Sequence, residues 1–216
     1  MLVIFDCDGV LVDSEPIAFQ ADNDMVRSLG LDWTYEECIQ KFLGRSTKSC
    51  VELIEVEMGR KVPEGWLEAW HEAMHDSLRR VPVPPVPGIF EALDALDAAR
   101  VPYCVASSGE MEKMEITLGS SGLMPRVAGR IYNAAMVARG KPAPDLFLHA
   151  AKSMGAQPAD CIVVEDAVAG VIAGVAAGMR VMAYAAAAYV DREGMRRAGG
   201  ELFEDMAALP RLIGVG

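Results

Sequence analysis

The sequence predicts an α/β fold, in which a doubly wound parallel sheet of the Rossmann-like type carries a small all-helical domain inserted after its first strand. Short apolar runs without alternation end abruptly in polar residues, as strands do when a parallel sheet buries them on both faces. Helical patterns separate these runs, and this alternation implies parallel strands joined by right-handed crossovers. The predicted strands cover residues 2–5, 101–106, 161–164 and 181–184.

Two helices of the predicted core begin directly after prolines. The first is expected over residues 89–99, after Pro87-Gly88. The second is expected over residues 146–154, with Asp145 as its N-cap and Gly155 as its stop.

Residues 14–80 have a different character, because they show helical periodicity and no convincing buried strand. The predicted domains are therefore an α/β core of residues 1–13 and 81–216, and a helical insert of residues 14–80. The proline-rich stretch 81–87 is expected to return the chain to the core as a stiff, extended connector. Four helices are expected in the insert, over residues 17–29, 35–42, 48–58 and 66–78.

Residues 167–190 are almost wholly apolar or glycine. Within them, Gly170, Gly174 and Gly178 recur at the four-residue spacing of membrane helix-packing faces. Arg180 interrupts the run, however, and much of it is weakly apolar alanine and glycine. A helix of about three turns followed by a buried strand fits better than a membrane span. The glycines would let that helix approach a sheet closely.

Composition and cysteine spacing limit the partners and the compartment. The 216 residues include 31 acidic and 20 basic side chains, which gives a formal net charge of −11. This balance argues against nucleic acid and against an anionic membrane surface, because both select basic proteins. Five widely spaced cysteines without a C-x-x-C pair indicate buried thiols in a reducing cytoplasm. We expect a monomer or a weak homo-oligomer.

Polar side chains follow the predicted strands where the strands end. In an open parallel sheet, ligands bind beyond the carboxyl ends of the strands, so these side chains should lie side by side. Several carboxylates in one place repel one another and need a cation, and hard oxygen ligands suit Mg²⁺. A lysine and a hydroxyl beside such an ion suit a phosphoryl group. The residues that predict this phosphoryl-transfer site are Asp6, Asp8, Ser107, Ser108, Lys141, Glu165 and Asp166.

Four short motifs contain these residues. They are FDCDGVLVDS at 5–14, VASSG at 105–109, GKPAPD at 140–145 and VEDA at 164–167. Their composition and order resemble the four motifs of the haloacid dehalogenase-like hydrolases, over about residues 1–13 and 82–185. The helical insert resembles the small cap of the subfamily that contains β-phosphoglucomutase and many sugar-phosphate phosphatases.

The resemblance implies a role for each matching position. Asp6 would be the nucleophile that forms an aspartyl-phosphate. Asp8 would protonate the leaving oxygen and then activate water. Ser107, with Ser108 beside it, and Lys141 would hold the phosphoryl oxygens.

The resemblance also implies how magnesium would be bound. Asp6, Asp166 and the backbone carbonyl of Asp8 would be ligands of the ion. Glu165 would assist beside the ion, either as a direct ligand or by orienting Lys141 and the metal-bound water, and both alternatives stay open.

Two positions of the insert bear on substrate choice. Gly44-Arg-Ser46 is similar to the cap loop that faces the active site in this subfamily, so Arg45 is either a substrate contact or a solvated surface arginine. Ala18 stands where mutase members and many phosphatase relatives have a histidine. This departure argues against a mutase, which must hold and return a bisphosphate intermediate.

The function that this resemblance implies is a magnesium-dependent phosphatase of a small phosphorylated metabolite, a sugar or sugar-acid phosphate. A β-phosphoglucomutase-like mutase is the alternative enzyme. A receiver-type signalling module belongs to a different class, although it also combines acidic strand ends, a phosphorylated aspartate, a hydroxyl and a lysine. Its phosphorylated aspartate lies on a later strand, and it has no cap.

Overall fold

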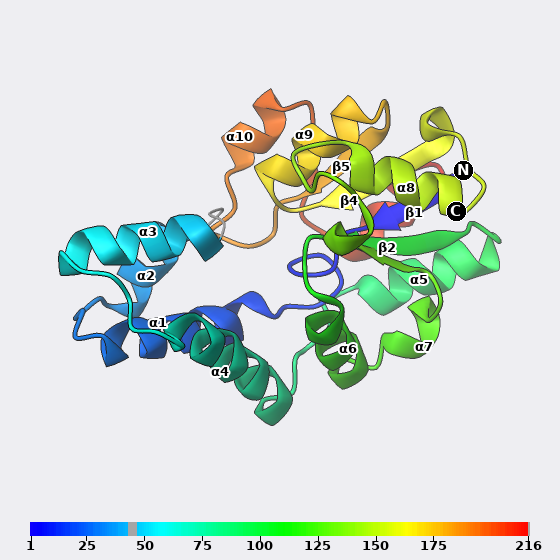
Figure 1. Cartoon of the computed structure of the whole chain (residues 1–216). Helices are drawn as coiled ribbons and strands as arrows, with labels where there is room; N and C mark the ends of the chain where they lie inside the picture. The colour runs from blue at the N-terminus through cyan, green and yellow to red at the C-terminus, as the bar shows by residue number, and fades with distance from the viewer. Residues whose placement is uncertain (43–46, 216) are drawn as a thin grey trace. The chain divides into compact units, whose positions relative to one another are not determined.

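The computed structural model describes residues 1–42 and 47–215, and it divides into two compact units (Figure 1). The first unit, the core, consists of Met1–Asp13 and Pro84–Gly216, and the second, the helical unit, of Ser14–Val83. The boundary expected from the sequence at residues 80–81 lies slightly before the Val83–Pro84 junction between the units. Arg45 lies outside the described residues.

The described residues of the core form a six-stranded parallel sheet with the order β3-β2-β1-β4-β5-β6. The α/β, Rossmann-like fold class predicted from the sequence is therefore confirmed. The first strand lies in the middle of the sheet, where it pairs with β2 on one side and β4 on the other. The strands are β1 (Leu2–Phe5), β2 (Tyr103–Ser107), β3 (Ile131–Asn133), β4 (Cys161–Glu165), β5 (Arg180–Tyr184) and β6 (Glu201–Phe203).

The helices α8 and α9 pack on one face of this sheet, α8 against β1, β2 and β3, and α9 against β4 and β5 (Figure 1). Leu2 and Ile4 of β1 belong to the apolar cluster under these helices. Side chains alternate along a strand, so Phe5 points to the opposite face, where its ring meets Tyr103 edge-on. The core helices are α5 (Ile89–Ala98), α6 (Met111–Ser120), α7 (Met124–Val127), α8 (Asp145–Ser153), α9 (Val168–Ala176), α10 (Arg192–Arg197) and α11 (Leu209–Leu212). Short 3-10 turns occur at η1 (Ala134–Met136), η2 (Pro158–Asp160) and η3 (Met206–Ala208).

The expected N-cap at Asp145 is wrong. The N-cap position of α8 is Pro144, and Asp145 is the first helical residue. Its carboxylate accepts two hydrogen bonds from the Arg139 guanidinium, at 2.8 and 3.1 Å. An ion pair with a neighbouring loop has replaced the local cap.

The glycine-rich stretch after residue 167 forms the helix α9 and then the strand β5, as the sequence predicted. A Cβ atom on Gly174 would lie 2.6 Å from a methyl group of Val181 and 3.4 Å from the Cβ of Val163. The absence of a side chain at Gly174 therefore allows α9 to approach the sheet. Within the described part of the chain, no helix combines the length and apolarity needed to cross a bilayer.

The described residues of the helical unit form α1 (Glu15–Ser28), α2 (Tyr35–Phe42), α3 (Thr47–Met58) and α4 (Trp66–Arg80). Their shared core is aromatic, because Trp33, Phe42 and Trp70 form a chain of ring contacts. The indole N–H of Trp70 donates to Asp22 at 2.7 Å, so its polar edge is satisfied. All five cysteines of the chain are free and buried.

Candidate active site

Asp6 directly follows β1, and strand alternation places its side chain on the face that α8 and α9 cover. The backbone N–H of Asp6 donates to the carbonyl of Val164 at 2.9 Å, which continues the ladder between β1 and β4. The chain then turns at Gly9, which has a φ of 72° and donates its N–H to Val12. Asp8 lies in this turn, so both aspartates occupy the carboxyl end of a central strand.

Glu165 ends β4 and points to the same face, in phase with Cys161 and Val163 of the apolar cluster. Its Oε2 accepts hydrogen bonds from the N–H groups of Asp166 and Ala167, both at 3.0 Å. These N–H groups precede α9, so the carboxylate stabilises the N-terminal end of that helix. The sequence permits this arrangement only with glycine at 170, where a Cβ atom would lie 1.8 Å from Glu165 Oε1.

Lys141 comes from the loop before α8 and lies between the ends of β1 and β4. Its Nζ is 2.6 Å from Asp6 Oδ1 and 2.5 Å from Glu165 Oε1. The lysine side chain is only 6 % exposed, and the ammonium lies 4.9 Å from the centre of the Phe147 ring. One cation therefore bridges two buried carboxylates from separate strands.

Burial changes the acid–base behaviour of Asp6 and Lys141. It raises the pKa of Asp6 from 3.8 to about 7, although the Lys141 ammonium opposes that rise and Glu165 and Asp8 add to it. Burial alone would lower the pKa of Lys141, but Asp6 and Glu165 outweigh it and hold that pKa above its usual value. Lys141 is therefore a permanent cation at neutral pH.

The donor set at this edge of the sheet fits a magnesium ion. Carboxylate oxygens of Asp6, Glu165 and Asp166 all lie within 4.8 Å of one another, and oxygen is the ligand that Mg²⁺ prefers. A Cβ atom on Gly9 would lie 1.9 Å from Asp166 Oδ2, so the main chain after Asp8 passes directly against this carboxylate.

The charges at the site also fit a divalent cation. Four carboxylates, from Asp6, Asp8, Glu165 and Asp166, face two ammonium groups in the ion pairs described for this site. These six groups alone carry a formal charge of −2 when all are ionised, so a divalent cation is compatible with them.

The two serines expected at the site differ in their surroundings. Ser107 ends β2 and is buried, and its Oγ accepts a hydrogen bond from the Gly109 N–H at 3.1 Å. A Cβ atom on Gly109 would lie 3.5 Å from both Ser107 Oγ and Asp8 Oδ2, so the serine hydroxyl and the Asp8 carboxylate flank the same glycine. Ser108 is exposed.

Lys113 is a residue of the site that the sequence did not reveal. Its Nζ lies 2.8 Å from Asp8 Oδ2, and both side chains are 17 % exposed. Lys113 lies in the first turn of α6, six positions after Ser107 and outside the four motifs. Its place in the first turn is the signal that could have indicated it, since a helix that follows a parallel strand begins at the ligand-binding edge of the sheet.

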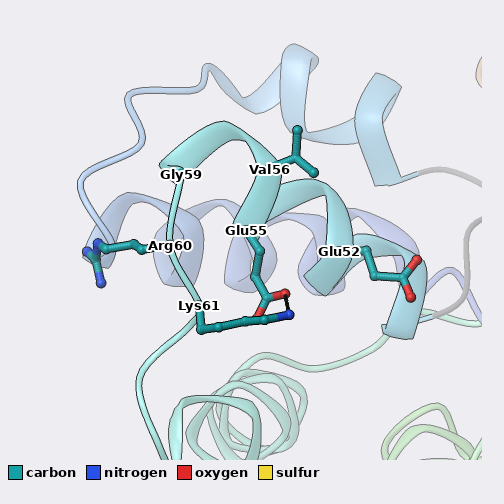
Figure 2. A pocket seen from close by; sticks show the side chains of 6 residues that line it. All are labelled: Glu52, Glu55, Val56, Gly59, Arg60 and Lys61. Atoms are coloured by element: carbon teal, nitrogen blue, oxygen red, sulfur yellow. Dashed lines mark hydrogen bonds and ion pairs between the residues drawn. The ribbon is translucent and has the colours of Figure 1, made fainter.

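A concave region on the helical unit has a chemistry different from that of the Asp6 site (Figure 2). This cavity of about 420 Å³ is formed by the end of α3 and the loop after it. Figure 2 shows Glu55 and Lys61 pointing toward one another, with an ion pair of 2.6 Å, and Glu55 also accepts from the Val62 N–H. These contacts hold the loop against the helix, which is a structural role.

The chain is similar to several known proteins. A family model described as haloacid dehalogenase-like hydrolase matches residues 3–184. The 6-phosphogluconate phosphatase of Escherichia coli (strain K12) is 32 % identical over 184 residues, which cover 85 % of this chain and 82 % of the relative.

Two solved structures are similar to this chain over nearly its whole length. A conserved haloacid dehalogenase-like protein of Agrobacterium tumefaciens has a TM-score of 0.85 and 33 % identity, over 98 % of this chain and 96 % of that one. A HAD family hydrolase of Deinococcus radiodurans with bound phosphate and sodium has a TM-score of 0.83 and 29 % identity, over 98 % and 94 %.

The family and the phosphatase among the relatives confirm the predicted enzyme class, a phosphoric monoester hydrolase. They argue against the receiver-type signalling module. The four motifs, the six-stranded sheet and the match over residues 3–184 lead to one assignment: this chain belongs to the haloacid dehalogenase-like hydrolases.

Proposed function

We propose that the protein is a magnesium-dependent phosphatase that hydrolyses a sugar phosphate or sugar-acid phosphate through an aspartyl-phosphate on Asp6. The observation that supports this most strongly is the meeting of Asp6, Glu165 and Lys141 within hydrogen-bond distance at the carboxyl edge of the sheet. A buried carboxylate beside a permanent cation is suited to attack an anionic phosphoryl group, because the cation offsets the repulsion between the two anions.

In the first step, a carboxylate oxygen of Asp6 attacks phosphorus, and the bond between phosphorus and the ester oxygen breaks. The electron pair of that bond goes to the leaving oxygen, which takes a proton from Asp8 and departs as an alcohol. In the second step, Asp8 removes a proton from water as the water oxygen attacks phosphorus. The bond to Asp6 then breaks, which restores the carboxylate and releases inorganic phosphate.

The other residues hold the phosphoryl group during both steps. The hydroxyl of Ser107 accepts from the Gly109 N–H, and its own hydrogen can be donated to a phosphoryl oxygen. Lys141 donates to a second oxygen while Glu165 keeps its ammonium in place. Ser108 follows Ser107 in the chain and offers a further donor.

Magnesium would be held by Asp6, Asp166 and the main-chain carbonyl of Asp8, with Glu165 beside it, and would offset negative charge on the transferring group. The contacts of Glu165 favour the supporting role over direct ligation. Its Oε1 accepts from Lys141, and its Oε2 accepts from two backbone N–H groups.

The substrate class and the compartment are part of the proposal. The relative that acts on 6-phosphogluconate supports a sugar-acid phosphate, and the structure with bound phosphate supports a phosphate site in this fold. The free, buried state of all five cysteines supports the cytoplasm.

The experiment is a phosphate-release screen with magnesium, using 6-phosphogluconate, hexose 6-phosphates, hexitol phosphates and a hexose 1-phosphate. We expect stoichiometric inorganic phosphate from one of these classes and none with Asp6→Asn. Interconversion of the hexose phosphates without free phosphate would establish a mutase instead. Turnover that survives Asp6→Asn would remove Asp6 from the nucleophile role.

A further inference from the structure

The site contains a second ion pair, which connects two elements that the four motifs do not relate. The ammonium of Lys113 in α6 lies 2.8 Å from Oδ2 of Asp8, in the turn after β1. Both side chains are mostly shielded from water, with 17 % exposed, so the pair is weakly screened compared with an open surface pair.

The loop after β2 lies near the same oxygen, and hydrogen bonds close the turn that carries Asp8. A Cβ atom on Gly109 would lie 3.5 Å from Asp8 Oδ2, which places the loop after β2 against this atom. The turn that carries Asp8 is itself closed by hydrogen bonds from the Gly9 and Leu11 N–H groups, at 2.8 and 2.9 Å. The backbone of Asp8 and one of its carboxylate oxygens are therefore both held.

This restraint has a chemical consequence. The terminal torsion of an aspartate side chain has broad minima, so an unrestrained carboxylate rotates through a wide range of directions. Proton transfer requires the donor oxygen within about 2.6–3.2 Å of the acceptor. Misplacement of a reacting group by about 1 Å can cost a factor of about 10² in rate.

We propose that Lys113 is a positioning residue for Asp8, and that its contact with Oδ2 orients the carboxyl group so that Oδ1, which carries the proton, faces the leaving oxygen of the substrate. This inference rests on the proposed function, because it assumes that Asp8 protonates the leaving group. It assigns to Lys113 a role distinct from that of Lys141, whose ammonium contacts the Asp6 and Glu165 carboxylates.

Esters that differ in leaving group separate this positioning role from a structural role and from phosphate binding. The specificity constant kcat/KM reports the steps up to formation of the phosphoenzyme. p-Nitrophenolate leaves as a stable anion without taking a proton, whereas the alkoxide oxygen of an alkyl phosphate needs one as it leaves. If the Asp8 carboxyl group is no longer oriented toward the leaving oxygen, kcat/KM for an alkyl phosphate should therefore fall, whereas kcat/KM for p-nitrophenyl phosphate should stay nearly unchanged.

The test compares Lys113→Met, Lys113→Arg and the control Lys152→Met, an exposed lysine of α8, on p-nitrophenyl phosphate and on glycerol 2-phosphate. With Lys113→Met we expect kcat/KM to fall at least about tenfold for the alkyl ester and less than about twofold for the aryl ester. Lys113→Arg, which keeps the charge, should lie between Lys113→Met and the wild type. Inhibition by inorganic phosphate should stay within about twofold, because Lys113 is not assigned to bind phosphate.

Equal losses on both esters would overturn the inference, since a structural defect affects both alike. Weaker inhibition by phosphate together with equal losses would assign Lys113 to phosphate binding instead. Faster turnover of the alkyl ester would also overturn it. Asp8→Asn tests the proposed function separately. If kcat/KM of that variant falls equally for both esters, Asp8 is not the acid. If Asp8→Asn discriminates between the esters and Lys113→Met does not, only the role of Lys113 fails.

Discussion

The ammonium of Lys141 lies 2.6 Å from the Oδ1 of Asp6, although the two residues are 135 positions apart in the sequence. The parallel topology produces this contact, because the loop before α8 and the end of β1 both reach the carboxyl edge of the sheet. Glu165 lies 2.5 Å from the same ammonium. The three charges form one buried unit, and removal of one member changes the other two.

Replacement of Lys141 should therefore affect stability and activity together. Lys141→Met leaves two buried carboxylates without their cation, and breaking such a pair typically costs about 3–5 kcal/mol. We expect a lower free energy of unfolding in urea and a kcat/KM reduced by at least about 10². Lys152→Met, on the exposed surface of α8, is the matched control and should change neither quantity.

The double variant Lys141→Met/Glu165→Gln separates the two effects. It removes one of the two stranded charges, so part of the lost stability should return while activity stays low. Recovery of activity in the double variant would contradict the assignment of Lys141 to the phosphoryl group.

Magnesium should stabilise the protein more as pH rises. Burial raises the pKa of Asp6 from 3.8 to about 7, so at intermediate pH the folded metal-free protein binds more protons here than the unfolded chain does. The stability that Asp6 contributes without metal is therefore complete below about pH 4 and is lost as pH rises through about 7. An ion that binds the carboxylate form offsets this loss.

Thermal unfolding with EDTA and with magnesium checks this expectation. The rise in Tm caused by magnesium should be larger at about pH 8 than at about pH 5.5. Asp166→Asn should reduce the rise at both values. A rise that is equal at both pH values, or one that survives Asp166→Asn, would contradict the proposed ligand set.

Gly170 should be required for activity although it contacts no substrate in the proposed mechanism. A Cβ atom there would lie 1.8 Å from Glu165 Oε1, so Gly170→Ala must displace the carboxylate that holds Lys141. We expect kcat/KM to fall at least about tenfold, as for a misplaced catalytic group. Wild-type activity in this variant would show that Glu165 does not need its observed position.

Gly119→Ala is the matched control for this change. Gly119 lies in α6, and a Cβ atom there would meet nothing within 4 Å. Alanine should stabilise the helix by about 0.5–1 kcal/mol and leave kcat/KM unchanged.

The central part of the fold was predictable from sequence, and the edges were not. The strands β1, β2, β4 and β5 are buried and apolar, so they appear as continuous runs, and their predicted bounds lie within two residues of those observed. The edge strands β3 and β6 have three residues each and are partly exposed, which leaves no such run. Only their pairing with β2 and β5 identifies them.

The same distinction applies to the site. Asp6, Glu165 and Asp166 end neighbouring parallel strands, so topology alone brings them together. Lys113 lies at the same edge because α6 begins there, but its contact with Asp8 depends on the rotation of α6, which no residue pattern in the chain encodes. Arg45 stays a prediction because it lies outside the described residues.

A rapid-mixing experiment with Asp8→Asn, magnesium and p-nitrophenyl phosphate tests covalent catalysis by Asp6 most directly. The p-nitrophenolate of this ester leaves without an acid, whereas hydrolysis of the phosphoenzyme needs Asp8 as base. The phosphoenzyme should therefore accumulate. We predict a burst of one p-nitrophenol per enzyme molecule, followed by slow turnover, and a phosphoryl group located by mass spectrometry on Asp6. A reaction without a burst, or a phosphoryl group on another residue, would contradict covalent catalysis by Asp6.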